Sequence, residues 1–169
     1  MYPARVVMVC ANRDCAALEL AKKAGISREI FRLANFPDRR ARDVAMGKTL
    51  RTHDVELVVC AGYDAILERA FTREFEGRII NIHPSLLPEF AGTMDAVRMA
   101  LNAGVAETGC TIHVVTKDVD QGPILAQRRV EVKPDDTVES LRERIQAEEH
   151  GLLSEVVRQL AGRPLPLPL

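Results

Sequence analysis

Cysteines are few in this chain, and none is placed to suggest a metal site or a disulfide framework. There are four among 169 residues, and no two of them form a Cys-x-x-Cys pair. Three lie in or beside apolar runs, which favours reduced thiols buried as small hydrophobic side chains. Reduced thiols are typical of the cytoplasm, where we expect this protein, and no metal is predicted. The four are Cys10, Cys15, Cys60 and Cys110.

The chain also lacks a long apolar run and an excess of charge of either sign. No segment approaches the roughly 20 apolar residues that span a bilayer. The N-terminus has no charged region followed by an apolar region and a cleavage site. The formal net charge is -1, from 23 Lys and Arg against 24 Asp and Glu. We therefore expect a small-molecule substrate, and neither a membrane nor a nucleic acid as partner.

Apolar residues make up 47% of the chain, and their spacing predicts an α/β fold. The first half alternates β-branched runs with amphipathic stretches, the pattern of βαβ units on a parallel sheet. Strands are predicted at 5–10, 29–33, 55–60 and 78–82. Helices are predicted after a cap at Asn12 or Asp14, from about Asp38 to His53, within 65–71, and from Thr93 to Gly104.

The second half predicts a hairpin followed by a long helix. Residues 110–116 and 124–132 alternate apolar and polar side chains around a short segment rich in Asp and Gly. Asp136, with Glu139 three residues on, predicts a capping box for a helix that Gly162 ends. The fold expected is Rossmann-like, a mostly parallel sheet with this hairpin and helix. It forms one domain over 1–163, and the tail 164–169 is predicted to be extended or disordered.

Two polar segments are predicted to lie where ligands bind in such sheets, beyond the carboxyl ends of the strands. Asn81 and His83 are two residues apart in an extended chain, so their side chains point the same way. An amide and an imidazole side by side can donate hydrogen bonds to an oxygen that gains negative charge. Asp120, near the predicted hairpin tip, could orient the imidazole and accept a proton. This set of residues predicts acyl transfer onto an amine.

Structural roles remain open for the same residues. Asn81 and His83 could be hydrogen-bonding groups of a tight turn closed by Pro84 and Pro88, and the Asp-x-Asp-x-Gly segment ending at Gly122 could be a turn. An EF-hand is excluded, because no Glu stands at its final position and no helix precedes it. No Gly-x-Ser-x-Gly segment and no cysteine with an obvious base is present. Direct attack by the acceptor is therefore favoured over a covalent enzyme intermediate.

At these segments the chain resembles a known family. Residues 78–88 (RIINIHPSLLP) and 114–126 (VVTKDVDQGPILA) are similar to signature segments of the phosphoribosylglycinamide formyltransferases. Further similarity lies at 58–67 (VVCAGYDAIL), 109–114 (GCTIHV) and 145–150 (IQAEEH), in order over about residues 3–160. Formyltransferases acting on methionyl-tRNA or amino sugars share the HPSLLP and Asp-x-Gly elements. The Thr-x-His strand and the Gly-Pro-Ile continuation favour the glycinamide branch.

The resemblance implies formyl transfer from 10-formyltetrahydrofolate to the amine of glycinamide ribonucleotide, a step of purine biosynthesis. It implies that Asn81 and His83 bind the formyl oxygen, that Asp120 assists proton transfer, and that Thr111 and His113 lie near that group. The folate pocket would be lined by Tyr63, Ile66, Leu67, Val115, Thr116 and Asp118. The ribonucleotide side would be formed by Gly62, Pro84, Gln146 and Glu149, the last of which could equally be a solvated helix residue. Ala65 stands where the family commonly has Arg.

One part of the family pattern has no counterpart here. The family opens with a strand and a Gly-rich loop that holds the substrate phosphate, whereas 5–25 of this chain resembles its second strand and helix. The first βα unit is therefore expected to be missing, which would expose two strand edges or force a new pairing. A misassigned start, a rearranged sheet or partner chain, and loss of the phosphorylated substrate all remain open. Exposed edges would allow a homodimer. The alternative functions are hydrolysis of 10-formyltetrahydrofolate and a non-catalytic folate-binding or assembly module.

Overall fold

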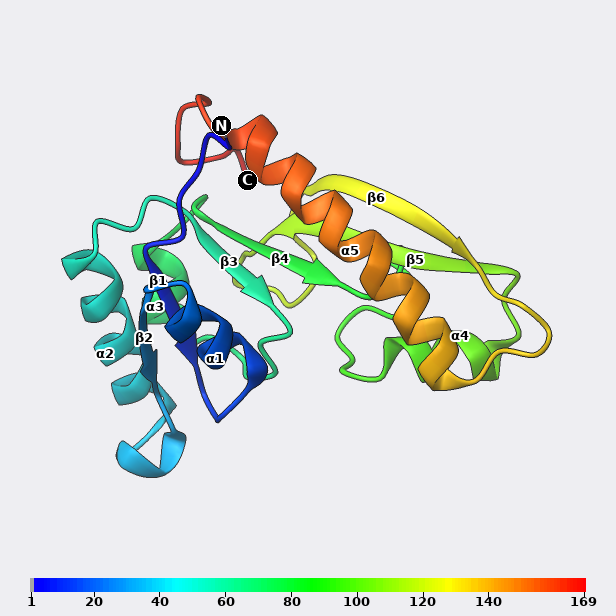
Figure 1. Ribbon diagram of the computed structural model, residues 1–169, viewed down its shortest axis with the longest axis horizontal. Coiled ribbons are helices and arrows are strands. Elements are labelled where there is room, and N and C mark those ends of the chain that lie inside the picture. The colour runs from blue at the N-terminus through cyan, green and yellow to red at the C-terminus, as the bar shows by residue number, and fades with distance from the viewer. Residues whose placement is uncertain (1) are drawn as a thin grey trace.

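The computed structural model describes residues 2–169 and contains six strands and six helical segments. Strands and helices alternate through the first two thirds of the chain, as predicted, and a long helix ends it (Figure 1). The α/β class is therefore confirmed. In chain order the elements are β1 (Met8–Ala11), α1 (Ala16–Lys23), β2 (Ser27–Ile30), η1 (Leu33–Asn35), α2 (Arg39–Thr52), β3 (Val58–Ala61), α3 (Arg69–Glu74), β4 (Ile79–His83), α4 (Ala96–Ala103), β5 (Glu107–Val114), β6 (Ile124–Glu131) and α5 (Val138–Leu160).

The strands form two sheets with mixed pairing. β1 pairs with β2 in parallel, and a second sheet has the order β3-β4-β5-β6. In that sheet β3 and β4 are parallel, while β4–β5 and β5–β6 are antiparallel. The parallel part of the fold is thus confined to β1–β4. The β5–β6 hairpin is antiparallel as predicted, because its short connection leaves no room for a crossover.

β1 and β3 are the inner edges of the two sheets and do not pair with each other. In the described part of the chain, β1 pairs only with β2, and β3 only with β4. Two features hold the sheets together. At the carboxyl ends, Asn12 and Arg13 donate hydrogen bonds to the carboxylate of Asp64, at 2.7 Å from each donor at its closest. On one face, side chains of β1 and β3 pack against a common apolar cluster. The two unpaired edges that the sequence predicts are therefore present.

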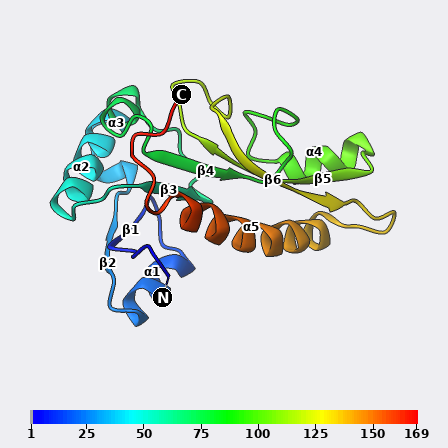
Figure 2. The ribbon, with the colours of Figure 1, turned by 90° about the horizontal axis from the view of Figure 1, so that it is seen from above.

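Two apolar cores cover the sheets. One packs α2 and α3 against β1 and β3, and the other lies beneath α5 on β4, β5 and β6. Figure 2 shows α2 and α3 on one side of the sheets and α1 and α5 on the other. The buried members of the first core are Phe31, Met46, Leu50, Phe71, Phe75 and Ile79. Because α5 spans the sheet that ends in the predicted site, its burial fixes the position of β4 and β5.

Two predicted helix caps are wrong, because arginines bind the carboxylates of Asp14 and Asp136. α1 begins after Cys15, with no side-chain cap; Asn12 contacts Asp64 instead, and Asp14 pairs with Arg32. Thr137, not Asp136, caps α5, in a capping box whose other member is Ser140. Asp136 binds Arg144 of the same helix. In both cases an arginine binds the carboxylate, which is therefore not available to the backbone amides at the helix end.

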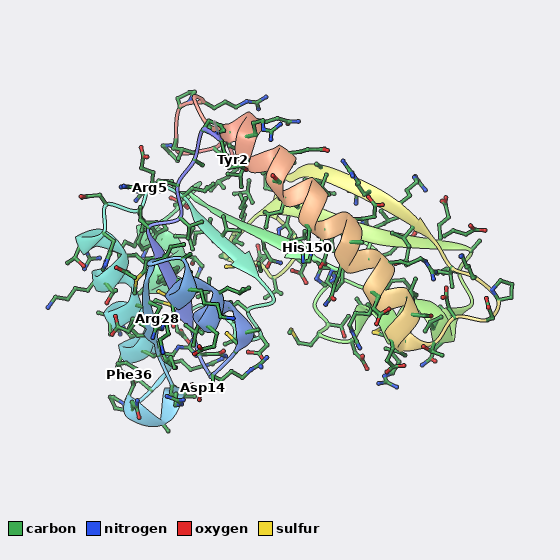
Figure 3. The ribbon with its side chains drawn as sticks, in the orientation of Figure 1. Tyr2, Arg5, Asp14, Arg28, Phe36 and His150 are labelled. Atoms are coloured by element: carbon green, nitrogen blue, oxygen red, sulfur yellow. The ribbon has the colours of Figure 1, made fainter. Side chains whose placement is uncertain are left out.

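The tail 164–169 is not helical, as predicted, and it packs against the domain. The amide of Leu167 donates to the carbonyl oxygen of Gly77 at 2.7 Å, and the Leu167 side chain joins the core beneath α5. Near the other end of the chain, the Tyr2 hydroxyl donates to the carbonyl oxygen of Ser154 on α5, as Figure 3 allows the reader to follow. Both described ends of the chain are therefore tied to the sheet and helix that carry the predicted site.

Candidate active site

Asn81 and His83 lie at the end of β4, where the strand register sets them opposite two polar residues of β5. Asn81 faces His113 and His83 faces Thr111. His83, Thr111 and His113 are all buried. The Asn81 amide nitrogen lies 3.1 Å from Nε2 of His113. Buried polar side chains need hydrogen-bond partners, and these four find them mostly among one another and the neighbouring backbone.

Asp120 reaches this group from the turn between β5 and β6. Its Oδ2 lies 3.4 Å from Nδ1 of His83, and its Oδ1 lies 3.4 Å from Nε2 of His113. The amide of Gly92 donates to Oδ2 at 2.9 Å. Asp120 has φ 54°, in the left-handed region that Asp tolerates better than most residues. The structure thus brings the sequence-predicted Asn81, His83 and Asp120 together, although 37 residues separate the last two.

Burial and neighbouring groups shift the pKa values of His83 and Asp120. Burial is the main influence on His83 and lowers the pKa of its imidazole, which the nearby Asp120 carboxylate opposes. The hydrogen bond from His113 is the main reason that the pKa of Asp120 lies below its usual value. His83 Nε2 lies 3.0 Å from the carbonyl oxygen of Phe90, which can only accept a hydrogen bond. His83 in the free protein is therefore a neutral imidazole beside an ionised carboxylate.

A second network fixes the loop after His83. The Thr111 hydroxyl donates to the carbonyl oxygen of Ser85 at 2.7 Å and accepts from the amide of Leu87 at 3.0 Å. Gln127 Nε2 donates to both the Thr111 hydroxyl and the Leu87 carbonyl, each at 2.9 Å. Sequence reasoning missed Gln127. Its place opposite Thr111 in the hairpin register is the one signal that could have identified it.

Three of the residues predicted around the folate, together with Gly62 of the predicted ribonucleotide side, lie in the loop after β3. Gly62, with φ 66°, and Tyr63 follow β3, and the Ile66 side chain is exposed, while Leu67 packs on the first core. The Tyr63 hydroxyl is buried without a hydrogen-bond partner among residues 2–169, and burial raises its pKa to about 12. A buried ion pair between Arg42 and Asp43 supports this loop, through the carbonyl of Ile66 and the amide of Glu68.

The other predicted folate residues belong to the turn that carries Asp120. The amide of Val115 donates to the carbonyl oxygen of Ile79, which anchors the start of the turn to β4. The Thr116 hydroxyl both donates to the carbonyl oxygen and accepts from the amide of Asp118, at 3.2 and 3.3 Å. The Asp118 side chain is exposed. The turn therefore presents backbone and an exposed carboxylate beside Asp120.

The residues predicted for the ribonucleotide side form a looser group. Pro84 is partly buried directly after His83, and Gln146 is exposed on α5. Glu149 is partly buried on α5, and burial alone raises the pKa of its carboxyl to about 7. A half-buried acid without a compensating charge is unusual, and such groups gather at functional sites.

Glu149→Gln should make the protein more stable at alkaline pH. The folded state raises this pKa from 4.5 to about 7, so it holds a proton that the unfolded state has released. Stability from this group is complete below pH 4.5 and is lost as pH rises through about 7. At pH 8 glutamine removes the cost of burying the charge, about 1–2 kcal/mol after allowance for partial exposure. Urea unfolding at pH 4.5 and pH 8 measures this, and a gain equal at both pH values would contradict it. Glu143→Gln, at an exposed position of the same helix, is the control.

Other features of the described chain give no second site of comparable chemistry. A hollow of about 1200 Å³ beside α1 and β2 includes Asp14 and Arg28, both labelled in Figure 3, and none of the predicted site residues. Within residues 2–169 no group of His, Cys, Asp and Glu side chains is arranged to hold a metal ion. None of the helices described there is both long and apolar enough to cross a membrane.

Comparison with known proteins finds that this chain is similar to formyl transferases in both sequence and structure. The formyl transferase family model matches residues 2–157. The phosphoribosylglycinamide formyltransferase of Mycobacterium tuberculosis is 46% identical over 160 residues, 95% of this chain and 74% of that protein. The enzyme of the same name from Bacillus subtilis is 38% identical over 92% of this chain and 80% of its own. The crystal structure of glycinamide ribonucleotide transformylase 1 from Symbiobacterium toebii has a TM-score of 0.91 at 45% identity, covering 94% of this chain and 74% of that one.

Proposed function

Because the chain belongs to the formyl transferase family, we propose that it transfers the formyl group of 10-formyltetrahydrofolate to the amine of glycinamide ribonucleotide. One observation carries the proposal. Asn81, His83 and Asp120 meet at the carboxyl end of β4, with one carboxylate 3.4 Å from each of two imidazoles. The names of the relatives support the choice of acceptor.

Asn81 is the donor that is available to a formyl oxygen without rearrangement. Its amide nitrogen carries two hydrogens, of which the 3.1 Å contact with His113 Nε2 can occupy at most one. When the acceptor amine attacks the formyl carbon, a C–N bond forms and the carbonyl oxygen gains a negative charge. The remaining N–H of Asn81 can stabilise that charge in a partly dry site, where such a donor is worth about 2.7–4 kcal/mol.

His83 and Asp120 act on the proton. The attacking nitrogen loses a proton, directly or through water, to His83 Nδ1, and the imidazolium that forms lies beside the Asp120 carboxylate. The charged N–H adds to the stabilisation of the oxyanion. The bond from the formyl carbon to the folate nitrogen then breaks, and that nitrogen takes the proton back. One proton leaves the amine and one reaches the folate, so the protein ends unchanged.

The exposed surface beside the cluster fits a folate. Ile66 and Val119 are exposed apolar side chains on the two loops that flank the carboxyl ends of β3 and β5. Asp118 on the second loop offers a carboxylate to the polar edge of a pteridine, and the turn around it offers backbone donors and acceptors. An aromatic ring system needs both an apolar surface and a few polar groups for orientation. These residues would hold the donor.

For the acceptor, Gln146 and Glu149 lie on one face of α5, three residues apart. Glu149 with its pKa of about 7 can bind an amine or a sugar hydroxyl as a carboxylate, and the approach of a cation would lower that pKa again. Burial of the ionised Glu149 carboxylate therefore destabilises the free protein above about pH 7, and a bound cationic substrate would offset that cost.

The test is the conversion of 10-formyltetrahydrofolate followed by absorbance, with and without glycinamide ribonucleotide. Turnover that requires the ribonucleotide supports the proposal. Equal turnover in both would identify a hydrolase that passes the formyl group to water. A folded protein without turnover in either would leave a folate-binding or assembly role, which equilibrium dialysis with the folate would then measure.

A further inference from the structure

Gln127 is an exposed residue of β6, the outer strand of its sheet, yet its amide reaches inward to the loop that follows His83 (Figure 1). It lies opposite Thr111 in the hairpin register, and Thr111 in turn lies opposite His83. Nε2 of Gln127 is 2.9 Å from both the Leu87 carbonyl oxygen and the Thr111 hydroxyl oxygen. One buried threonine therefore separates a surface side chain from the proposed catalytic imidazole.

The donors and acceptors around Thr111 follow from the groups present. The Leu87 carbonyl oxygen only accepts, so the Gln127 atom beside it is the nitrogen, which carries two hydrogens. The Ser85 carbonyl oxygen likewise takes the single hydrogen of the Thr111 hydroxyl. The oxygen of that hydroxyl then accepts from the Leu87 amide and from the second hydrogen of Gln127. No titratable group takes part, so the arrangement does not depend on a protonation state.

The loop that these bonds hold begins and ends at His83. Residues 84–89 follow the histidine directly, and the carbonyl oxygen of Phe90 then returns to within 3.0 Å of His83 Nε2. Inside the loop, the Ser85 hydroxyl donates to the carbonyl oxygen of Glu89, which ties the first part of the loop to the last. The position of the loop therefore sets the position of the carbonyl group that orients the His83 ring.

Thr111 and Gln127 supply all the side-chain hydrogen bonds that reach residues 84–89 from elsewhere in the described chain. We propose that Gln127 is a positioning residue, which holds the loop 84–89 and through it the orientation of the His83 imidazole. The inference rests on the proposed formyl transfer for its effect on rate, and on the contacts alone for its effect on the loop. Within residues 2–169 Gln127 forms no hydrogen bond with a predicted folate residue. Its loss should therefore lower kcat and leave the KM for the folate unchanged.

Two replacements separate the hydrogen bonds of Gln127 from its shape. Gln127→Glu keeps the shape, but its carboxylate donates no hydrogen bond and would face the Leu87 carbonyl oxygen. Gln127→Leu removes both polar atoms. At pH 7.5 each should lower kcat about 10-fold, because a small displacement of a catalytic group slows the chemical step. The KM for 10-formyltetrahydrofolate should change less than about twofold.

Arg129→Leu is the matched control, because Arg129 is also exposed and lies two residues further along the same strand. It should keep the parental kcat. Parental kcat in either Gln127 variant would overturn the proposal, as would a loss expressed only in the KM for the folate. A double-mutant cycle tests the route of the effect: in a His83→Ala background, Gln127→Leu should have little further effect, because the imidazole it positions is gone. A further 10-fold loss there would equally contradict the proposal.

Two measurements on the free protein keep this inference separate from the proposed function. Amide hydrogen exchange followed by NMR should be about 10-fold faster at the Leu87 amide in Gln127→Leu, and unchanged in Arg129→Leu, because opening of the loop becomes easier. The ring ¹⁵N signals of His83 should shift or broaden in Gln127→Leu, while those of His150 stay as in the parent protein. Unchanged exchange at Leu87, or unchanged His83 signals, would overturn the proposal.

The two sets of results distinguish the two proposals. The expected exchange and NMR results in a protein without formyl transfer would reject the proposed function and retain the role of Gln127 in holding the loop. Circular dichroism checks that the variants are folded. Where Gln127→Leu is not folded, Gln127→Glu decides by the same measurements.

Discussion

His83→Ala should lower kcat/KM for formyl transfer by about 10²- to 10⁴-fold, the usual range for a group that transfers protons and stabilises charge. The imidazole is 5% exposed and is the nearest base to Asp120 on β4. Alanine removes the proton acceptor and leaves Asp120 with His113 as its remaining imidazole partner. Most of the loss should appear in kcat, because His83 matters most when charge develops in the transition state.

Steady-state kinetics with both substrates varied measures this effect. His53→Ala is the matched control, since His53 lies at the end of α2 and contacts the carbonyl of Thr49. A His83→Ala enzyme within threefold of the parent would mean that Asp120 or water carries the proton unaided. A loss of the same size in His53→Ala would point to unfolding rather than to chemistry, and melting curves of both variants separate these cases.

The second large effect is expected from Gly122→Ala, which changes no functional group. Gly122 is buried in the turn between β5 and β6, two residues after Asp120. A Cβ atom there would overlap the carbonyl oxygen of Val114 and come within 3.1 Å of the Thr116 side chain. Val114 also anchors the end of the turn, because its amide donates a hydrogen bond to the carbonyl oxygen of Pro123 at 2.9 Å. The turn must therefore move, and Asp120 must move with it.

We expect Gly122→Ala to lower the free energy of unfolding by about 1–3 kcal/mol, as overpacking does, and to lower kcat by about 100-fold, as a displacement of about 1 Å can. Urea unfolding and steady-state kinetics measure the two effects. Gly151→Ala is the control, because the nearest atom to its added Cβ is Arg128 Nη1 at 3.4 Å and the position is helical. That variant should keep full activity and gain up to about 1 kcal/mol in stability. Normal kinetics in Gly122→Ala would show that Asp120 tolerates movement of its turn.

Much of the site is local in sequence and was predictable for that reason. Asn81 and His83 share a face because a strand alternates its side chains, whatever the rest of the fold does. The hairpin prediction placed Asp120 in a turn beside a strand that could reach β4. Long, periodic segments such as α5 and the buried strands also carry their own pattern, so their existence was predictable, with ends shifted by a few residues.

Features that depend on distant partners were not predictable in the same way. The predicted caps of α1 and α5 were wrong because Asp14 pairs with Arg32 and Asp136 pairs with Arg144. The spacing of the cap motif does not reveal either pair. Gln127 carries no motif, and its role comes only from its position across from Thr111. The tail 164–169 was predicted as extended or disordered, yet Leu167 is buried in the core beneath α5.

The sequence by itself determined the α/β class, the family and the pair of proposed catalytic side chains on one strand, because periodicity and contiguous motifs depend only on residues that are close together in the chain. Only the tertiary structure decided that Asp120 lies between two imidazoles and that Asn81 lies opposite His113. Only it decided that β1 and β3 remain unpaired within residues 2–169. Those facts arise from strand register and from competition among distant partners, and both exist only once the whole chain has packed.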